Sequence, residues 1–146
     1  RGRLFIDSLS IKRLLLLHSL RIFVETVLLL LYIHKVVPQI MTFEGRNLDI
    51  LSGISALIIF FLFKKANNRL FLLIWNFAGL ALLINIVVIA ILSAPFPFQQ
   101  FGFDQPNIAI LNFPFVWLPS VVVPLVLLSH LAAIRQLIVK NKIEVL

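Results

Sequence analysis

Three ionisable side chains interrupt a strongly apolar stretch near the start of the chain. Residues 14–37 read LLLLHSLRIFVETVLLLLYIHKVV, and this stretch contains His18, Arg21 and Glu25. At about 100° per residue of an α-helix, the three positions form a single stripe. Arg21 and Glu25 also have the i, i+4 spacing of an ion pair. Such a stripe could bind a charged substrate, exchange a proton or hold a lipid head group.

We expect Arg21 and Glu25 to pair with each other, because an unpaired charge within hydrocarbon costs at least about 2.5 kcal/mol. Two interpretations of the pair stay open. Ionisable residues inside a membrane span are functional by default, which predicts a substrate, proton or head-group site. The same two residues would also serve as a buried salt bridge that fixes how the helices pack.

Other polar residues at matching depths extend this intramembrane polar cluster. Asn76 falls at the level of Arg21 or His18, His130 falls at the level of His18, and Asn85 falls near the level of Glu25. Asn76 and Asn85 point to opposite faces of one helix, so they cannot both serve one site. Asn76 fits an interhelical hydrogen bond, and His130 fits a packing role better than that of a ligand.

The residue pattern does not favour a metal centre or a hydrolase. His18, Glu25 and His130 are side chains that zinc and iron accept, but Arg21 lies between the first two and would repel a cation. The chain has no cysteine, no Gly-x-Ser-x-Gly elbow and no glycine-rich phosphate loop. The sequence therefore predicts no metal and no catalytic residue, and it leaves any cofactor undefined.

The composition defines the kind of fold that must position these residues. Of 146 residues 61% are hydrophobic and the mean hydropathy is +1.07, whereas a soluble domain is roughly 45–50% apolar. A small globule cannot bury that excess, so lipid must cover it. The net charge of +7 then reflects basic residues that flank membrane spans rather than binding of nucleic acid.

Four apolar segments have about the length of membrane-spanning helices. They cover residues 14–37, 48–63, 70–93 and 108–134, and the second is the shortest. Continuous apolar runs favour helices, since a barrel would show alternation. We expect an all-α transmembrane bundle of four helices that forms one domain over residues 1–146.

Residues typical of helix starts and stops agree with these limits. Asn47, Asn68 and Asn107 stand just before the second, third and fourth segments, where an asparagine side chain can cap free amide groups. Pro38 and Pro95 follow the first and third segments, at positions suited to ending a helix.

Three prolines recur at five-residue intervals in the fourth segment, at Pro114, Pro119 and Pro124. Each removes an amide donor and disturbs a carbonyl four residues earlier, so we expect a kinked or partly unwound helix. Broken helices often line transport sites, but proline is also frequent in ordinary membrane helices, and both interpretations stay open.

The distribution of basic residues predicts the orientation of the bundle. With four spans, one side carries about ten basic residues: Arg1, Arg3, Lys12, Arg13, Lys64, Lys65, Arg69, Arg135, Lys140 and Lys142. The other side carries Lys35 and Arg46. The positive-inside rule therefore places both termini in the cytoplasm.

The loops on the far side form a second group of candidate residues. They carry Glu44, Arg46, Asp49 and Asp104 among several phenylalanines, and Arg46 could pair with Asp104 or Glu44. We favour an aromatic belt that anchors these loops at the membrane surface. The alternative is a mouth for a small molecule or lipid where the two loops meet.

Parts of the chain resemble a family of uncharacterised bacterial multi-pass membrane proteins. The resemblance rests on MTFEGRNLDILSG (41–53), LLIWN (72–76) and NIVVIAILSAPFPFQQFGFDQPNIAILNFPFVWLPSVVVPLVLLSHLAAIRQL (85–137), with Ser93 to Pro119 as its most specific part. It implies a bacterial inner membrane and brings no activity. Relatives often have proline where Phe23 stands and an aromatic residue where Asn112 stands. Their upstream helices, and Arg1 in place of Met, lead us to expect the C-terminal part of a longer protein.

The leading hypothesis is a small-molecule or proton-linked transport or ligand-binding protein. In it, Arg21 holds an anionic group or pairs with Glu25, and Glu25 exchanges the proton. One alternative is a non-catalytic subunit or assembly factor whose polar stripe faces a partner helix or a second copy. Another is a lipid-modifying enzyme with His18 or His130 as its acid–base group. The expected partners are the lipid bilayer and partner helices or a homo-oligomer, and not nucleic acid.

Overall fold

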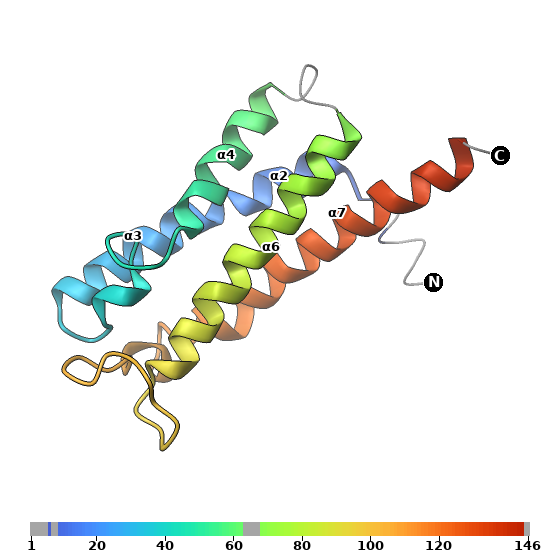
Figure 1. The fold of residues 1–146 in the computed structure, drawn as a ribbon. Coiled ribbons are helices and arrows are strands. Elements are labelled where there is room, and N and C mark those ends of the chain that lie inside the picture. Colours follow the sequence, from blue (N-terminus) through green and yellow to red (C-terminus); the bar gives the residue numbers. More distant parts are fainter. Residues whose placement is uncertain (1–5, 7–8, 63–67, 145–146) are drawn as a thin grey trace.

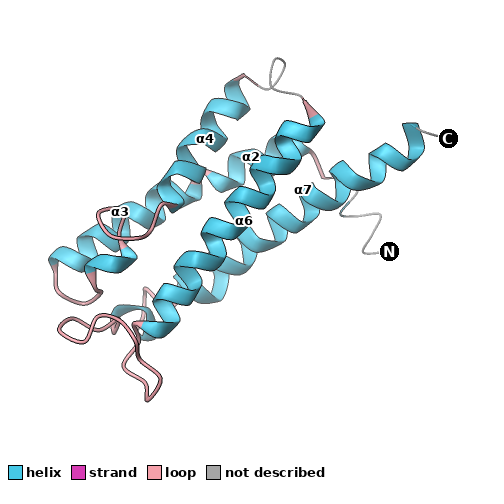
Figure 2. Ribbon diagram, in the orientation of Figure 1, coloured by secondary structure: helices cyan, strands magenta, loops and turns pink. Residues whose placement is uncertain are grey.

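The helices of the chain lie along one another in an all-α bundle (Figure 1). The computed structural model describes residue 6, residues 9–62 and residues 68–144, with side chains as far as residue 139. Within these ranges there are helices and turns but no strands (Figure 2). The elements are α2 (Ile11–His18), α3 (Leu20–Ile33), η1 (Gln39–Met41), α4 (Asp49–Phe61), α6 (Arg69–Leu92), η2 (Ala109–Leu111), η3 (Leu118–Val122) and α7 (Val123–Glu144).

The first two helices form one apolar rod from Ile11 to Ile33. Ser19 joins them in a helical conformation, and its hydroxyl donates to the Leu16 carbonyl at 2.7 Å. The rod ends before the predicted limit because Lys35 adopts a left-handed conformation with φ of 60°, which terminates a helix. The first predicted segment is therefore confirmed, with shifted ends, as helical and as long and apolar enough to cross a membrane.

The third predicted span matches α6 closely. Asn68 caps it as expected, because its side-chain oxygen accepts a hydrogen bond from the amide of Phe71 at 3.2 Å. The helix runs for 24 residues and ends at Leu92, before Pro95. These local signals were sufficient to place the helix from the sequence.

The second predicted span is wrong, because α4 has 13 residues and extends only about 20 Å at 1.5 Å per residue. The hydrocarbon core is about 30 Å thick. The connection before α4, residues 34–48, folds back along α3 and is called the fold-back connection below. The helix α4 therefore begins at Asp49, beside the middle of the rod (Figure 1). In the described ranges, three helical segments are long and apolar enough to cross a membrane: Ile11–Ile33, Arg69–Leu92 and Leu118–Val139.

The fourth predicted span begins too early. Residues 108–116 form η2 and turns instead of an α-helix. Asn107 does not cap a helix here, and its side-chain amide donates to the Ala90 carbonyl at 3.0 Å. Pro119 lies in the first turn of η3, a π-helical turn, where the missing amide breaks no helical hydrogen bond. The expectation of a partly unwound helix is confirmed at this end.

The start of α2 and the C-terminal half of α7 lie at the same end of the bundle (Figure 1). The side-chain amide of Gln136 donates to the carbonyls of Ile6 and Leu9, at 2.6 and 2.8 Å. The fold-back connection and α4 together return the chain to this end after the first helical rod.

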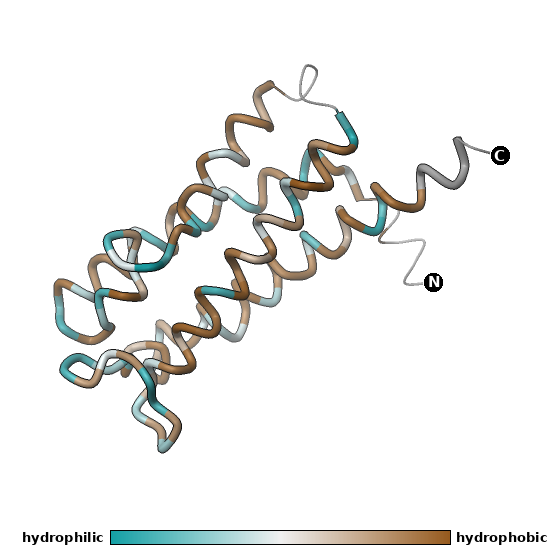
Figure 3. The backbone as a smooth tube through the Cα atoms, in the orientation of Figure 1, coloured by the Kyte–Doolittle hydropathy of each residue, from teal (hydrophilic) through white to brown (hydrophobic). Residues whose placement is uncertain are grey.

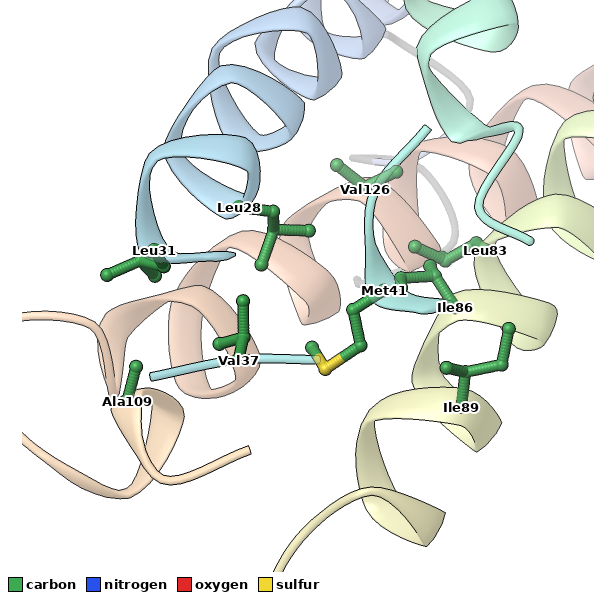
Figure 4. Packing of buried hydrophobic residues seen from close by; sticks show 9 residues of the cluster. All are labelled: Leu28, Leu31, Val37, Met41, Leu83, Ile86, Ile89, Ala109 and Val126. Atoms are coloured by element: carbon green, nitrogen blue, oxygen red, sulfur yellow. The ribbon is translucent and has the colours of Figure 1, made fainter. Parts of the chain in front are cut away.

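The main apolar core lies in the half of the bundle that carries the connections before α4 and before η3. Its buried residues come from α3, α6, α7 and these connections (Figure 4): Leu28, Leu31, Val37, Met41, Leu83, Ile86, Ile89, Ala109 and Val126. Hydrophobic residues dominate the helices, and hydrophilic residues gather mostly in the connections (Figure 3). Many large apolar side chains, such as Phe23 at 69% exposure, also face outward, as expected of a surface that lipid covers.

Candidate functional site

Arg21 is the centre of the buried polar cluster, with only 2% of its surface exposed. Its Nη1 lies 3.1 Å from Oδ1 of Asp49 at the start of α4. Its Nη2 donates to the Gly79 carbonyl of α6 at 3.1 Å and lies 3.1 Å from Nε2 of His130 on α7. One guanidinium thus connects four helices of the bundle.

The expected ion pair between Arg21 and Glu25 is wrong, because Asp49 takes that place. The sequence predicts Asp49 in a loop on the far side of the membrane, but Asp49 is 4% exposed and lies at the first position of α4. A carboxylate is favourable there, since the helix N-terminus carries partial positive charge. Hydropathy alone did not predict the folded-back connection that brings Asp49 to Arg21.

Glu25 is bound instead by Asn47, two residues before the start of α4. The Asn47 side-chain amide donates to Oε1 of Glu25 and, at 2.9 Å, to the Met41 carbonyl. Its oxygen accepts from the Asp49 amide at 3.1 Å. Glu25 is 1% exposed, and its second oxygen, Oε2, has no hydrogen-bond partner among the described residues.

The hydrogen bonds of His130 define its protonation state. A guanidinium can only donate, so Nε2 of His130 accepts from Arg21 and the ring hydrogen lies on Nδ1. Nδ1 then donates to Oδ1 of Asn76 at 3.0 Å, and the Asn76 amide donates to the Leu72 carbonyl at 2.8 Å. His130 is therefore neutral and fully bonded, and Asn76 forms the interhelical hydrogen bond that we expected.

His18 completes the cluster by packing rather than by hydrogen bonding. Its ring stacks on His130 with centroids 4.0 Å apart, and it meets Trp75 edge-on at 5.3 Å. Neither ring nitrogen of His18 has a hydrogen-bond partner in the part of the chain that the structure describes. The matching depth of His18, Asn76 and His130 was predicted correctly from the sequence.

Two glycines allow this close approach, and the sequence analysis missed both. A Cβ atom on Gly79 would lie 2.7 Å from Cε1 of His130 and 3.0 Å from Oγ of Ser52. A Cβ atom on Gly53 would lie 2.8 Å from Cγ1 of Ile22 on α3. An isolated glycine inside an apolar helix is a signal of such packing, and it was available at both positions.

A cavity of about 300 Å³ adjoins the polar cluster. Arg21, Glu25 and Asp49 line its polar end, and the other lining residues are apolar side chains of α3, α6, α7 and the connections. Ile91 and Pro119 line it and are also exposed on the outer surface, which places its mouth between α6 and η3. Neither His18 nor His130 is among its lining residues.

The remaining candidate residues lie away from this site. Asn85 is exposed, and its amide donates to the Arg46 carbonyl at 3.1 Å, beside the residue that bonds Glu25, so it lies outside the polar cluster. Glu44, Arg46 and Asp104 are exposed, and no ion pair joins them within residues 9–62 and 68–139. Exposed phenylalanines surround this end, including Phe103 at 72% and Phe113 at 79%.

The fold and this site define an all-α bundle with a buried polar cluster and an adjoining apolar cavity. The chain belongs to the DUF8737 family, a domain of unknown function, whose family model matches residues 8–138. This match confirms the expectation of an uncharacterised family and includes every residue of the polar cluster. No curated protein and no solved structure matches the chain.

Proposed function

We propose that this protein is an integral membrane protein that binds a small, mostly apolar molecule, as a transport or ligand-binding protein does. The observation that carries the proposal is the cavity of about 300 Å³ whose apolar walls end at Glu25. Ligand pockets are mainly apolar with a few polar groups that fix orientation. Glu25 is the group that would exchange a proton with the ligand, because Arg21 already neutralises Asp49.

The proposed membrane location rests on three apolar helical segments of sufficient length and on the apolar outer surface. We propose that the fold-back connection and α4 together act as the return pass, with both termini in the cytoplasm of a bacterial inner membrane. Lys12, Arg13, Arg69 and Arg135 support this orientation through the positive-inside rule. Other basic residues used in that argument lie outside the described side chains: Arg1, Arg3, Lys64, Lys65, Lys140 and Lys142.

The two alternative functions have less support from the geometry. A subunit or assembly factor needs no cavity beside its polar stripe, whereas Glu25 and Arg21 both line one. An enzyme would need a histidine within reach of its substrate, but His130 is bonded on both ring nitrogens and neither histidine lines the cavity. We also propose a different role for Arg21. Instead of holding an anionic group or pairing with Glu25, it holds the helices together.

Toluene, a neutral apolar probe, tests whether the cavity binds ligands. Met41 lines the cavity and is the single methionine of the sequence, so a ¹³C label on its methyl group reports occupancy in protein reconstituted into nanodiscs. We expect a saturable shift of this resonance on toluene titration. Ala90 lines the cavity, so the larger side chain of A90F should fill part of the cavity and abolish the shift. A81F changes an exposed position of the same helix and should keep the shift. Equal shifts in both variants, or no saturation in the wild type, would contradict the proposal.

A further inference from the structure

We infer that the ligand of this cavity is an amphipathic cation: a single protonated amine on an apolar body. The inference rests on the proposed ligand-binding function and names the chemical class of the ligand. It follows from the charges, the free hydrogen-bonding atoms and the walls of the cavity.

The charges at the polar end favour a cation. Two carboxylates and one guanidinium line it, from Glu25, Asp49 and Arg21. Arg21 and Asp49 offset each other at 3.1 Å, which leaves Glu25 without an ion-pair partner of its own among the described residues. An anionic ligand would add a third negative charge to a site that water does not screen, where like charges repel strongly.

The hydrogen-bonding atoms lead to the same conclusion. Oε1 of Glu25 already accepts from Asn47, whereas Oε2 is buried and has no partner among the described residues. Nε and Nη1 of Arg21 are also buried without a hydrogen-bond partner among the described residues. However, Nη1 lies 3.1 Å from Oδ1 of Asp49, and Nη2 is occupied by the Gly79 carbonyl and His130. The acceptor at Glu25 is thus free for a donor, while an anion at Arg21 would have to compete with Asp49.

The walls require the cation to bring its own apolar body. A bare metal ion needs several oxygen ligands, but the lining beyond the three charged residues is made of side chains such as Leu28, Ile86 and Val126. An ammonium group satisfies Oε2 of Glu25, and an attached hydrocarbon covers these walls. The mouth at Ile91 and Pro119 opens on the apolar outer surface, so such a molecule reaches the site from the lipid.

Three probes of equal chain length separate the ligand classes: octylammonium, 1-octanol and octanoate. Their binding is followed by the Met41 methyl resonance in nanodiscs at neutral pH. We expect octylammonium to saturate the shift at a concentration at least about tenfold lower than octanol, the ratio that 1.4 kcal/mol produces. Octanoate should give no saturable shift.

Glu25→Gln removes the charge and keeps an oxygen for Asn47. This variant should bind octylammonium no better than octanol, whereas Glu44→Gln, at an exposed loop position, should keep the preference. Equal half-saturation of octylammonium and octanol in the wild type would overturn the inference, as would an unchanged preference in a folded E25Q protein. If E25Q does not fold, the wild-type series alone decides.

The outcome separates this inference from the proposed function. Saturable binding of octanoate or octanol without preference for the amine would show a ligand-binding cavity of another class. Failure of toluene and of all three octyl probes would contradict both.

Discussion

The guanidinium of Arg21 pairs with Asp49, 3.1 Å away on another helix, although Glu25 stands one turn along its own helix. This pair joins the middle of the first rod to the first residue of α4. It therefore determines the depth at which α4 begins.

Asp49→Asn should destabilise the protein strongly. Removing one partner of a buried pair leaves an uncompensated charge and costs about 3–5 kcal/mol, here on Arg21. Thermal unfolding in nanodiscs, followed by circular dichroism, measures the loss. Asp104→Asn changes an exposed carboxylate and should shift stability by no more than about 0.5 kcal/mol. Similar melting of the two variants would show that the Arg21–Asp49 pair does not hold α4.

Gly79→Ala should destabilise the packing of α6 against α7 by about 1–3 kcal/mol, the cost of overpacking. The new methyl group would lie 2.7 Å from Cε1 of His130, and the measurement is the midpoint of denaturant unfolding. His130→Ala removes that atom, so the double variant should lose less stability than the two single losses added together. Additive losses would show that the two positions do not contact each other.

Replacing each of the two histidines with phenylalanine should change the stability of the protein by different amounts. His18→Phe keeps the stacking and loses no hydrogen bond to a described residue, so its stability should stay within about 1 kcal/mol of wild type. His130→Phe leaves Arg21 and Asn76 without their partner and should cost at least about 2 kcal/mol. Thermal melts of both proteins give the comparison. A larger loss for His18→Phe would mean that its ring nitrogens make bonds essential to the fold.

Single cysteines test the proposed orientation, since the chain has none of its own. Asp104→Cys, in the connection after α6, should react with a membrane-impermeant maleimide in intact cells. Arg13→Cys, at the start of the first rod, should react only after the membrane is opened. Both native side chains are exposed, so accessibility within the fold is matched. The reverse labelling pattern would place the termini outside.

Depth along a helix was predictable from the sequence, and lateral contacts were less so. His18, Asn76 and His130 meet because each lies a countable number of residues from the end of its apolar segment. The partner of Arg21 was not predictable in this way, because nothing in the hydropathy of residues 34–48 indicates that they fold back along α3. The local i, i+4 spacing predicts Glu25 as the partner of Arg21, whereas the folded chain places Asp49 in contact with Arg21.

The limits of the fourth helix show a second reason why the sequence did not predict the whole fold. Residues 108–116 are as apolar as a membrane helix, but they form turns and η2. Apolar composition indicates that transfer of a segment into lipid is favourable. It does not indicate whether the backbone of that segment can form helical hydrogen bonds. Pro114 and Pro119 carried that information, and they mark the start of η3 more reliably than the hydrophobic run does.

In the membrane location proposed above, the position of Asp49 also constrains the order in which the chain enters the bilayer. During synthesis the segment with Arg21 emerges first, and α4 follows with its carboxylate at the leading end. That carboxylate meets a compensating charge inside the membrane only where the first rod is already inserted. In the proposed membrane location we therefore expect α4 to be a dependent segment, which completes its insertion by docking on a helix that was synthesised before it.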